Sequence, residues 1–279
     1  MARRVTLPES RLKRRKRVRR VRLLIALSVL LLLLLGIVIG LSWVPFIRIH
    51  MVEVRGTETI ATSTLEEFVN GEIEGKMIFV LPKNNIFLYP KQNIISKLLA
   101  RYPTLKGANV RAQNFETIGV EVAERKPRAL WCGENKSDGD QCYLMDETGF
   151  AYAEAPAYEN APYVRYFGAA TTTEGFTSSI TPKQFLTAEN FAALLALVDA
   201  LAAHQKNSLI KEAEVDSHSD VYLAFSNGFT LIFSLKDAKG DVFERFTLAL
   251  ASGPFLNKSI ADFEYLDLRF GDKLYYRER

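Results

Sequence analysis

The sequence has few of the residues that build catalytic and metal centres. Its 279 residues include two cysteines, two tryptophans and three histidines. The histidines, His50, His204 and His218, lie far apart and lack the spacing of a metal site. The motifs HExxH, GxSxG and GxxxxGK[ST] are absent, so the most easily recognised metalloprotease, hydrolase and nucleotide-binding classes are excluded. We therefore expect no metal and no cofactor.

One stretch, DSHSD at 216–220, does bring Asp, His and Ser together. It lies between two alternating apolar stretches, which favours a polar hairpin turn, and adjacency in sequence is not the geometry of a triad. The carboxylates are scattered, and no apolar pocket that would pair two of them is indicated. We expect a binding protein rather than an enzyme.

Charge is distributed unevenly along the chain. Residues 1–22 hold eleven Lys or Arg residues against Glu9, whereas the remaining residues hold 25 basic and 31 acidic side chains. The folded part therefore gives no support to nucleic-acid binding. The basic run alone would suit a nucleic-acid or targeting patch. The segment that follows it indicates whether the run instead flanks a membrane anchor.

That segment, residues 23–43, carries no charge and ends with Trp43. As a helix it would span about 31 Å, which matches the hydrocarbon core of a bilayer. A cleaved signal peptide would have a shorter apolar region and a small-residue cleavage site. We expect a single-pass transmembrane helix, with the basic tail 1–22 in the cytoplasm, where anionic lipid would attract it, and residues 44–279 outside.

The two cysteines bracket a polar loop. Cys132 and Cys142 enclose GENKSDGDQ between two strand-like stretches. A pair that closes a hairpin loop in an oxidising compartment is a candidate disulfide, and two free thiols are the alternative.

The external part divides into two predicted domains of α+β class. Residues 44–126 show the order β-α-α-β-β, with helices over 63–71 and 90–103 and two strands within 107–127. Residues 127–270 are mostly β, with two helices over 187–207 and 239–253 and a hairpin at Asn227-Gly228. Residues 271–279 are expected to be a short charged tail.

The stretch 263–270 alternates with a period of two. This pattern predicts a strand whose residues Leu266, Leu268 and Phe270 hold the domain. Residues Tyr265, Asp267 and Arg269 would then point outward. If the strand lies at the edge of a sheet, it can accept a strand from another chain; a core strand paired on both sides is the alternative.

The order of these parts resembles the FtsQ/DivIB family of bacterial cell-division proteins, over nearly the whole chain. The resemblance rests on the anchor and on four stretches: VEVRG (52–56), VAERKPRALW (122–131), LMDETG (144–149) and YLDLRFGDKLYYR (265–277). It implies a POTRA domain at about 48–126 and a β domain at about 127–270. The family's E-R-x-P step between the domains corresponds to Glu124, Arg125 and Pro127. Its terminal strand corresponds to Tyr265, Leu266, Asp267, Leu268, Arg269 and Phe270.

The resemblance also implies a role. Members of the family are non-enzymatic scaffolds of the divisome in the cytoplasmic membrane, at the division septum. They join the membrane proteins FtsB/DivIC and FtsL and help control septal peptidoglycan synthesis, and their last strand accepts a strand from FtsB. The cysteine pair is not a signature of the family. A POTRA-containing assembly or secretion factor and a membrane-anchored cell-wall enzyme are the alternatives.

Overall fold

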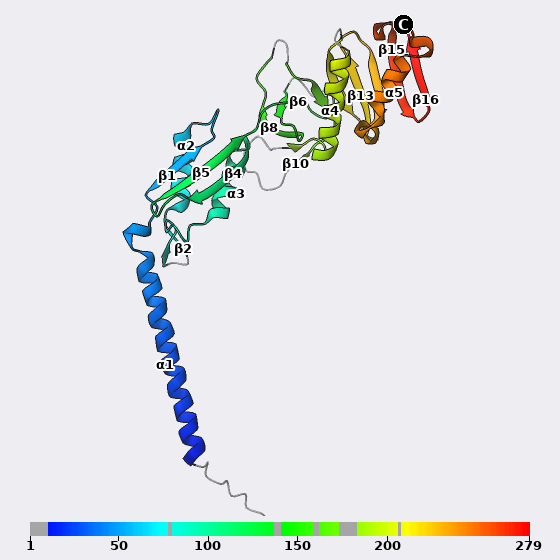
Figure 1. The fold of residues 1–279 in the computed structure, drawn as a ribbon. Helices are drawn as coiled ribbons and strands as arrows, with labels where there is room; N and C mark the ends of the chain where they lie inside the picture. The colour runs from blue at the N-terminus through cyan, green and yellow to red at the C-terminus, as the bar shows by residue number, and fades with distance from the viewer. Residues whose placement is uncertain (1–10, 78–79, 137–140, 159–161, 173–182, 206–207) are drawn as a thin grey trace, which may run out of the picture. The chain divides into compact units, whose positions relative to one another are not determined.

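The computed structural model describes residues 11–77, 80–136, 141–158, 162–172, 183–205 and 208–279. The chain forms two compact units, Met1–Ile95 with Asn109–Glu121, and Ser96–Ala108 with Val122–Arg279. The predicted class is confirmed at this level: the protein is α+β, with an N-terminal apolar helix and a large, mostly β sheet (Figure 1). Residues 96–108 group with the second unit, so the division differs from the boundary expected after residue 126.

The helix α1 (Arg11–Ser42) contains the apolar run. Within the described residues, its part Arg17–Ser42 is the one helix long and apolar enough to cross a membrane, and no part of its most apolar window is buried. The helix continues back into the basic run, so the described part of the predicted tail is helical rather than extended. Residues 1–10 of that tail lie outside the described residues. After α1 comes a 3-10 turn, η1 (Pro45–Ile47), which begins with proline.

The next elements follow the predicted order β-α-α-β-β, with an additional short strand pair between the helices. They form a sheet in the order β1-β5-β4 over the described residues, in which β1 runs parallel to β5 and Val52 lies opposite Ile118. Alternate apolar residues of these strands are buried with one face of each helix, which is why the pattern could be recognised from sequence. The elements are β1 (Met51–Arg55), α2 (Thr62–Ile73), β2 (Lys76–Met77), β3 (Leu81–Pro82), α3 (Lys91–Arg101), β4 (Leu105–Ala112) and β5 (Thr117–Glu124).

The second unit is built on one mixed sheet. Over the described residues it has eleven strands in the order β10-β11-β8-β7-β6-β9-β12-β13-β14-β15-β16. The pairs β6–β9, β9–β12 and β14–β15 are parallel, and the others are antiparallel. The strands are β6 (Ala129–Trp131), β7 (Tyr143–Met145), β8 (Phe150–Glu154), β9 (Arg165–Phe167), β10 (Thr171–Thr172), β11 (Lys183–Gln184), β12 (Ile210–Val215), β13 (Asp220–Phe225), β14 (Thr230–Ser234), β15 (Phe263–Phe270) and β16 (Lys273–Glu278).

Two helices bury their apolar faces in the core of this sheet (Figure 1). The helix α4 (Ala188–His204) begins at Thr187, whose hydroxyl accepts the backbone N–H of Asn190, as its capping sequence predicts. The helix α5 (Asp241–Leu250) follows a 3-10 segment, η2 (Leu235–Lys239). Two further 3-10 turns, η3 (Gly253–Phe255) and η4 (Ile260–Asp262), lead into β15.

The two turns predicted in the β12–β14 meander are confirmed. Gly228 has φ 85° in the β13–β14 hairpin, a conformation that favours glycine. In the 216–220 turn, the Asp216 carboxylate accepts the backbone N–H groups of His218 and Asp220. Its side chain therefore closes the turn, as aspartate commonly does.

Candidate partner-binding edge

The strand expected to lie at the sheet edge, β15, is paired on both sides. It runs parallel to β14, with Leu231 opposite Leu266, and antiparallel to β16, with Leu266 opposite Tyr276. The stretch 271–279, expected to be a tail, contains β16. The prediction of an edge strand at 263–270 is therefore wrong.

The side chains of β15 follow the predicted alternation only in part. Leu266 and Leu268 are buried, as expected, and Tyr265 is partly exposed. Phe270 was expected in the core but is 52% exposed, because the register shifts between Asp267 and Phe270 and moves the last residue out of phase.

Asp267 was expected to point outward to a partner, but it is buried. It lies opposite Ile232 of β14 and Tyr275 of β16, so neighbouring strands flank it. Arg269 covers it, with its Nε 3.0 Å from Oδ1 and its Nη2 2.6 Å from Oδ2 of that carboxylate. A buried carboxylate needs this kind of paired, hydrogen-bonded cation.

Arg269 is held by its own domain instead of being offered to a partner. Besides Asp267, its Nη1 donates to Oδ2 of Asp220 at 2.6 Å, which joins β15 to β13. The hydrogen bonds that Arg269 donates to Asp267 and Asp220 raise the pKa of Arg269 above its ordinary value, so it stays charged. Arg269, predicted to point outward, is in this structure a cation that pairs with two carboxylates of the sheet.

One edge of the described sheet is β16, and the other is β10. The strand β16 is hydrogen-bonded to β15 on one side, and all six of its residues are exposed. Gly271, at φ 59°, and Asp272 form the two-residue turn that joins the strands, with Phe270 opposite Lys273. Glycine followed by aspartate between two apolar alternating runs is a recognised hairpin signal, and this signal in the sequence could have predicted β16.

The two faces of β16 have different surroundings. Tyr276 packs on Phe255 and Phe263, with ring centroids 5.2 and 5.8 Å away, so its face joins the core side. On the other face, Tyr275 contacts Phe270 at 5.1 Å between ring centroids, and both rings are about half exposed. One face of the strand therefore anchors it, and the other presents an aromatic surface.

On the face away from α4 and α5, partly exposed side chains lie on either side of the buried Asp267 and the Arg269 that covers it. The register places Tyr222, Ile232, Asp267 and Tyr275 side by side on β13, β14, β15 and β16. Tyr222 and Ile232 are partly exposed. A partner strand added to β16 would place one further side chain beside Tyr275 in this row. Contacts with Tyr275 could therefore fix the register of the added strand.

The residues predicted to lie between the domains, Glu124, Arg125 and Pro127, occupy the segment from the end of β5 to just before β6. Of these three residues, Arg125 contacts two other segments through its guanidinium group. Its Nε donates to the carbonyl oxygen of Pro103 at 3.1 Å, and its Nη1 pairs with the carboxylate of Asp146 in the β7–β8 turn. Arg125 thereby joins two segments of the second unit.

The partner of Arg125 is a fully buried carboxylate. Burial raises the pKa of Asp146, but hydrogen bonds from Thr148 and Arg125 outweigh that effect and hold the pKa below its ordinary value. Asp146 also accepts the backbone N–H of Phe150, and each of these hydrogen bonds favours the charged form. The Asp-Glu-Thr-Gly stretch is therefore a structural turn with an ion pair at its centre.

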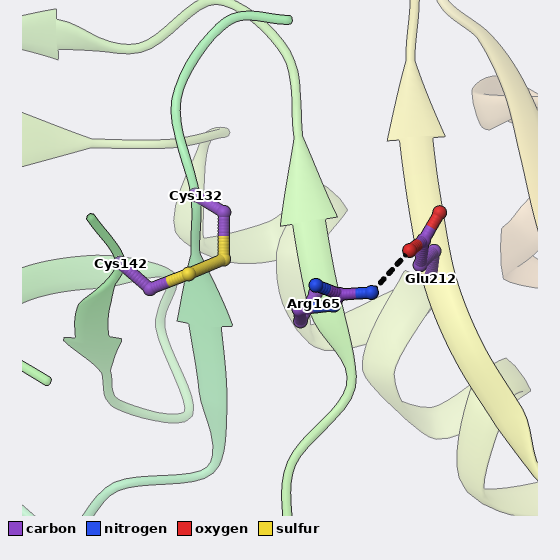
Figure 2. Close-up of a disulfide and its surroundings, with 4 residues drawn as sticks. All are labelled: Cys132, Cys142, Arg165 and Glu212. Carbon is purple, nitrogen blue, oxygen red and sulfur yellow. Dashed lines mark hydrogen bonds and ion pairs between the residues drawn. A yellow bond between two sulfur atoms is a disulfide. The ribbon is translucent and has the colours of Figure 1, made fainter. Parts of the chain in front are cut away.

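Cys132 and Cys142 are joined in a disulfide (Figure 2). It lies just beyond the Trp131–Tyr143 pair of β6 and β7, and so closes the loop between these strands covalently. Figure 2 also shows the neighbouring ion pair between Arg165 and Glu212, which joins β9 to β12. The centre of the sheet is thus held by a covalent bond and a charge pair, whereas β16 has an open side.

Within the described ranges, no group of three or more His, Cys, Asp or Glu side chains is arranged to hold a metal ion. Comparison with protein-family models gives no match, and comparison with curated proteins gives none. The candidate site therefore rests on the geometry of the β15–β16 edge.

Proposed function

We propose that this protein is a membrane-anchored scaffold that binds a partner by strand addition at β16. The observation that carries the proposal is the edge itself: in the part of the chain that the structure describes, β16 pairs with β15 only and is exposed along its whole length. An added strand would bond to backbone groups that otherwise face water, and the side chains of β16 would select the sequence.

The chemistry of the edge suits an amphipathic partner strand. Phe270, Leu274, Tyr275 and Tyr276 are between 37% and 52% exposed, and Lys273 and Arg277 flank the run 274–276. Apolar anchors between basic side chains would accept a strand in which apolar and acidic residues alternate. Because most of these side chains are already ordered by contacts within the hairpin, binding would cost little additional conformational entropy.

The proposed topology places this edge outside the cytoplasm. The helix α1 would cross the membrane with its basic N-terminal part in the cytoplasm, where it would also contact anionic lipid. The disulfide supports an oxidising location for the second unit, because cytosolic thiols are generally kept reduced.

The resemblance to FtsQ/DivIB supplies the biological context of this proposal. The protein would act in bacterial septation, with residues 48–126 as a POTRA domain and FtsB/DivIC-like and FtsL-like proteins as partners. The order β1-α2-α3-β4-β5, apart from the short β2–β3 pair, supports the POTRA assignment. The scaffold would help control septal peptidoglycan synthesis without catalysing it.

Photo-crosslinking in the source bacterium tests the proposal. A photoreactive amino acid replaces Tyr275 on β16 in the full-length chain, and in a control protein it replaces Leu248 of α5, which is 60% exposed against 50% for Tyr275. We expect position 275 to crosslink a small coiled-coil membrane protein that position 248 does not capture. Failure to crosslink at 275, or the same products at both positions, would contradict strand addition at β16.

A further inference from the structure

Three exposed phenylalanines meet in the first unit. Phe46 follows the end of α1 closely in sequence, and Phe87 is linked to that end through hydrogen bonds of Asn85. Phe46 belongs to η1, Phe87 to the β3–α3 connection and Phe115 to the β4–β5 turn. Their exposed fractions are 61%, 70% and 51%, and the centroid of Phe115 lies 5.3 Å from that of Phe46 and 6.3 Å from that of Phe87. Exposed aromatic rings gathered from three separate segments indicate an interaction surface.

Asn85 connects this aromatic cluster to α1. Its side chain is buried, and its Nδ2 donates to the carbonyl oxygen of Ser42, the last residue of the helix, at 3.0 Å. Its Oδ1 accepts the backbone N–H of Phe87 at 2.9 Å. A single amide side chain therefore supplies a hydrogen-bond donor to the last carbonyl oxygen of the helix and also binds the backbone of Phe87.

Backbone hydrogen bonds hold the other two rings. The N–H of Ile86 donates to the carbonyl oxygen of Ile47, which ties the Phe87 segment to the turn that carries Phe46. The N–H groups of His50 and Met51 both donate to the carbonyl oxygen of Glu116, next to Phe115. The cluster is therefore pre-ordered, so that burying it elsewhere would cost little side-chain and backbone entropy.

The surroundings of the cluster match the interface of a membrane. Trp43 follows α1 directly, and its Nε1 donates to the carbonyl oxygen of Val80. The Lys76 ammonium and the Arg48 guanidinium lie 5.3 and 5.8 Å from the centre of its ring. Aromatic rings beside basic groups are typical of the headgroup region, where rings enter the acyl boundary and cations meet phosphates.

We propose that Phe46, Phe87 and Phe115 dock on the outer surface of the bilayer that α1 crosses, so that the first unit lies against the membrane. The occupant is the lipid surface, because Asn85 bonds the cluster to the end of α1, the one described helix that is long and apolar enough to cross a membrane. The proposal rests on the membrane anchoring proposed above. Docking would restrict how far the unit tilts on its anchor and so limit the positions that the second unit can reach.

Electron paramagnetic resonance of the full-length chain tests this proposal. The protein is reconstituted in phosphatidylcholine vesicles that contain phosphatidylglycerol, with the Cys132–Cys142 disulfide kept oxidised. Nitroxide labels are placed in separate proteins at Phe87→Cys, Phe115→Cys, Glu67→Cys and Leu32→Cys. Glu67 is exposed on α2, which contributes no ring to the cluster, and Leu32 lies within α1. Collision with oxygen reports lipid, and collision with a water-soluble nickel complex reports water.

We expect the oxygen-to-nickel ratio at positions 87 and 115 to exceed the ratio at 67 severalfold, and to lie below the ratio at 32. If 87 and 115 match 67 while 32 is deep, the anchor stands and docking is overturned. If 87 and 115 are shielded from both reagents, protein covers the cluster, which also overturns lipid docking. If the label at 32 is reached by nickel, the anchoring proposal fails, and docking fails with it.

Discussion

The strands β15 and β16 are consecutive in sequence and paired in space, yet they have opposite environments. The core of β15 is inaccessible to solvent at Leu266, Asp267 and Leu268, whereas every residue of β16 is exposed. The difference shows that, in this hairpin, the stronger pattern of apolar residues belongs to β15, the strand that is paired on both sides and contributes to the core. The strand that is free to bind has a weaker pattern, because only one of its sides is packed.

The same comparison separates two kinds of arginine. Arg269 on β15 is bound by two carboxylates and is 28% exposed, whereas Arg277 on β16 pairs with Glu264 alone, at 3.2 Å, and is 67% exposed. Because water screens the second pair, the two side chains should differ strongly in their contribution to stability. This contrast gives the largest effect that we predict.

Arg269→Ala should lower the free energy of unfolding by about 2–4 kcal/mol, because it leaves Asp267 buried without its cation. The loss should be somewhat smaller than for a fully buried pair, since the side chain of Arg269 is 28% exposed. Arg277→Ala, the matched control, should change it by less than about 0.5 kcal/mol. Denaturant unfolding of both variants measures this difference. Equal effects of the two substitutions would contradict this contrast, since the ion pairs of Arg269 on β15 and Arg277 on β16 would then contribute equally to stability.

The disulfide allows the stability of the sheet to be changed without touching its edge. Replacing Cys132 and Cys142 together by serine removes a cross-link over a separation of 10 residues. Chain entropy predicts a loss of roughly 2.5–3 kcal/mol in the free energy of unfolding. Affinity for the partner, measured by calorimetry at a temperature where the variant is folded, should not change. A parallel loss of affinity would place part of the binding surface at the β6–β7 hairpin.

The smallest effects separate the two faces of β16. Tyr276→Ala removes ring contacts with Phe255 and Phe263 and should cost about 1–2 kcal/mol of unfolding free energy. Tyr275→Ala should cost less than about 1 kcal/mol but weaken partner binding about tenfold, which corresponds to about 1.4 kcal/mol. The pair is checked by thermal unfolding and a pull-down titration. If Tyr275→Ala leaves affinity intact, the exposed face of β16 is not the surface that a partner meets.

Much of the secondary structure could be predicted from sequence because local signals determine it. Thr187 caps α4, Gly228 permits the β13–β14 turn, and Asp216 closes its turn with its own side chain. These devices depend on a few adjacent residues, so their pattern is visible in the sequence.

The edge of the sheet lies one strand later than the sequence pattern predicts, for two physical reasons. The alternation of β15 does not show how many neighbours the strand has, because pairing depends on distant segments such as β14. The buried position of Asp267 depends on Arg269 and on the flanking strands, which no local pattern reveals. The glycine and aspartate at 271–272 were the one local signal for β16, and this signal was overlooked.

The phenylalanine cluster of the first unit was not predicted for a similar reason. Phe46, Phe87 and Phe115 are far apart in sequence, and each alone reads as an isolated apolar residue. Hydrogen bonds made by Asn85, Ile86 and Glu116 bring their segments together in the folded chain.

Amide hydrogen exchange of the full-length protein, with and without a partner identified by the proposed crosslinking, tests the central claim most directly. Free β16 has one unpaired side, so the amides on that side should exchange nearly as fast as in an unfolded chain. When the partner binds, alternate amides within 273–278 should slow strongly, and those of β15 should change little because they are already paired. Unchanged exchange in β16, with new protection elsewhere in the chain, would contradict strand addition at this edge.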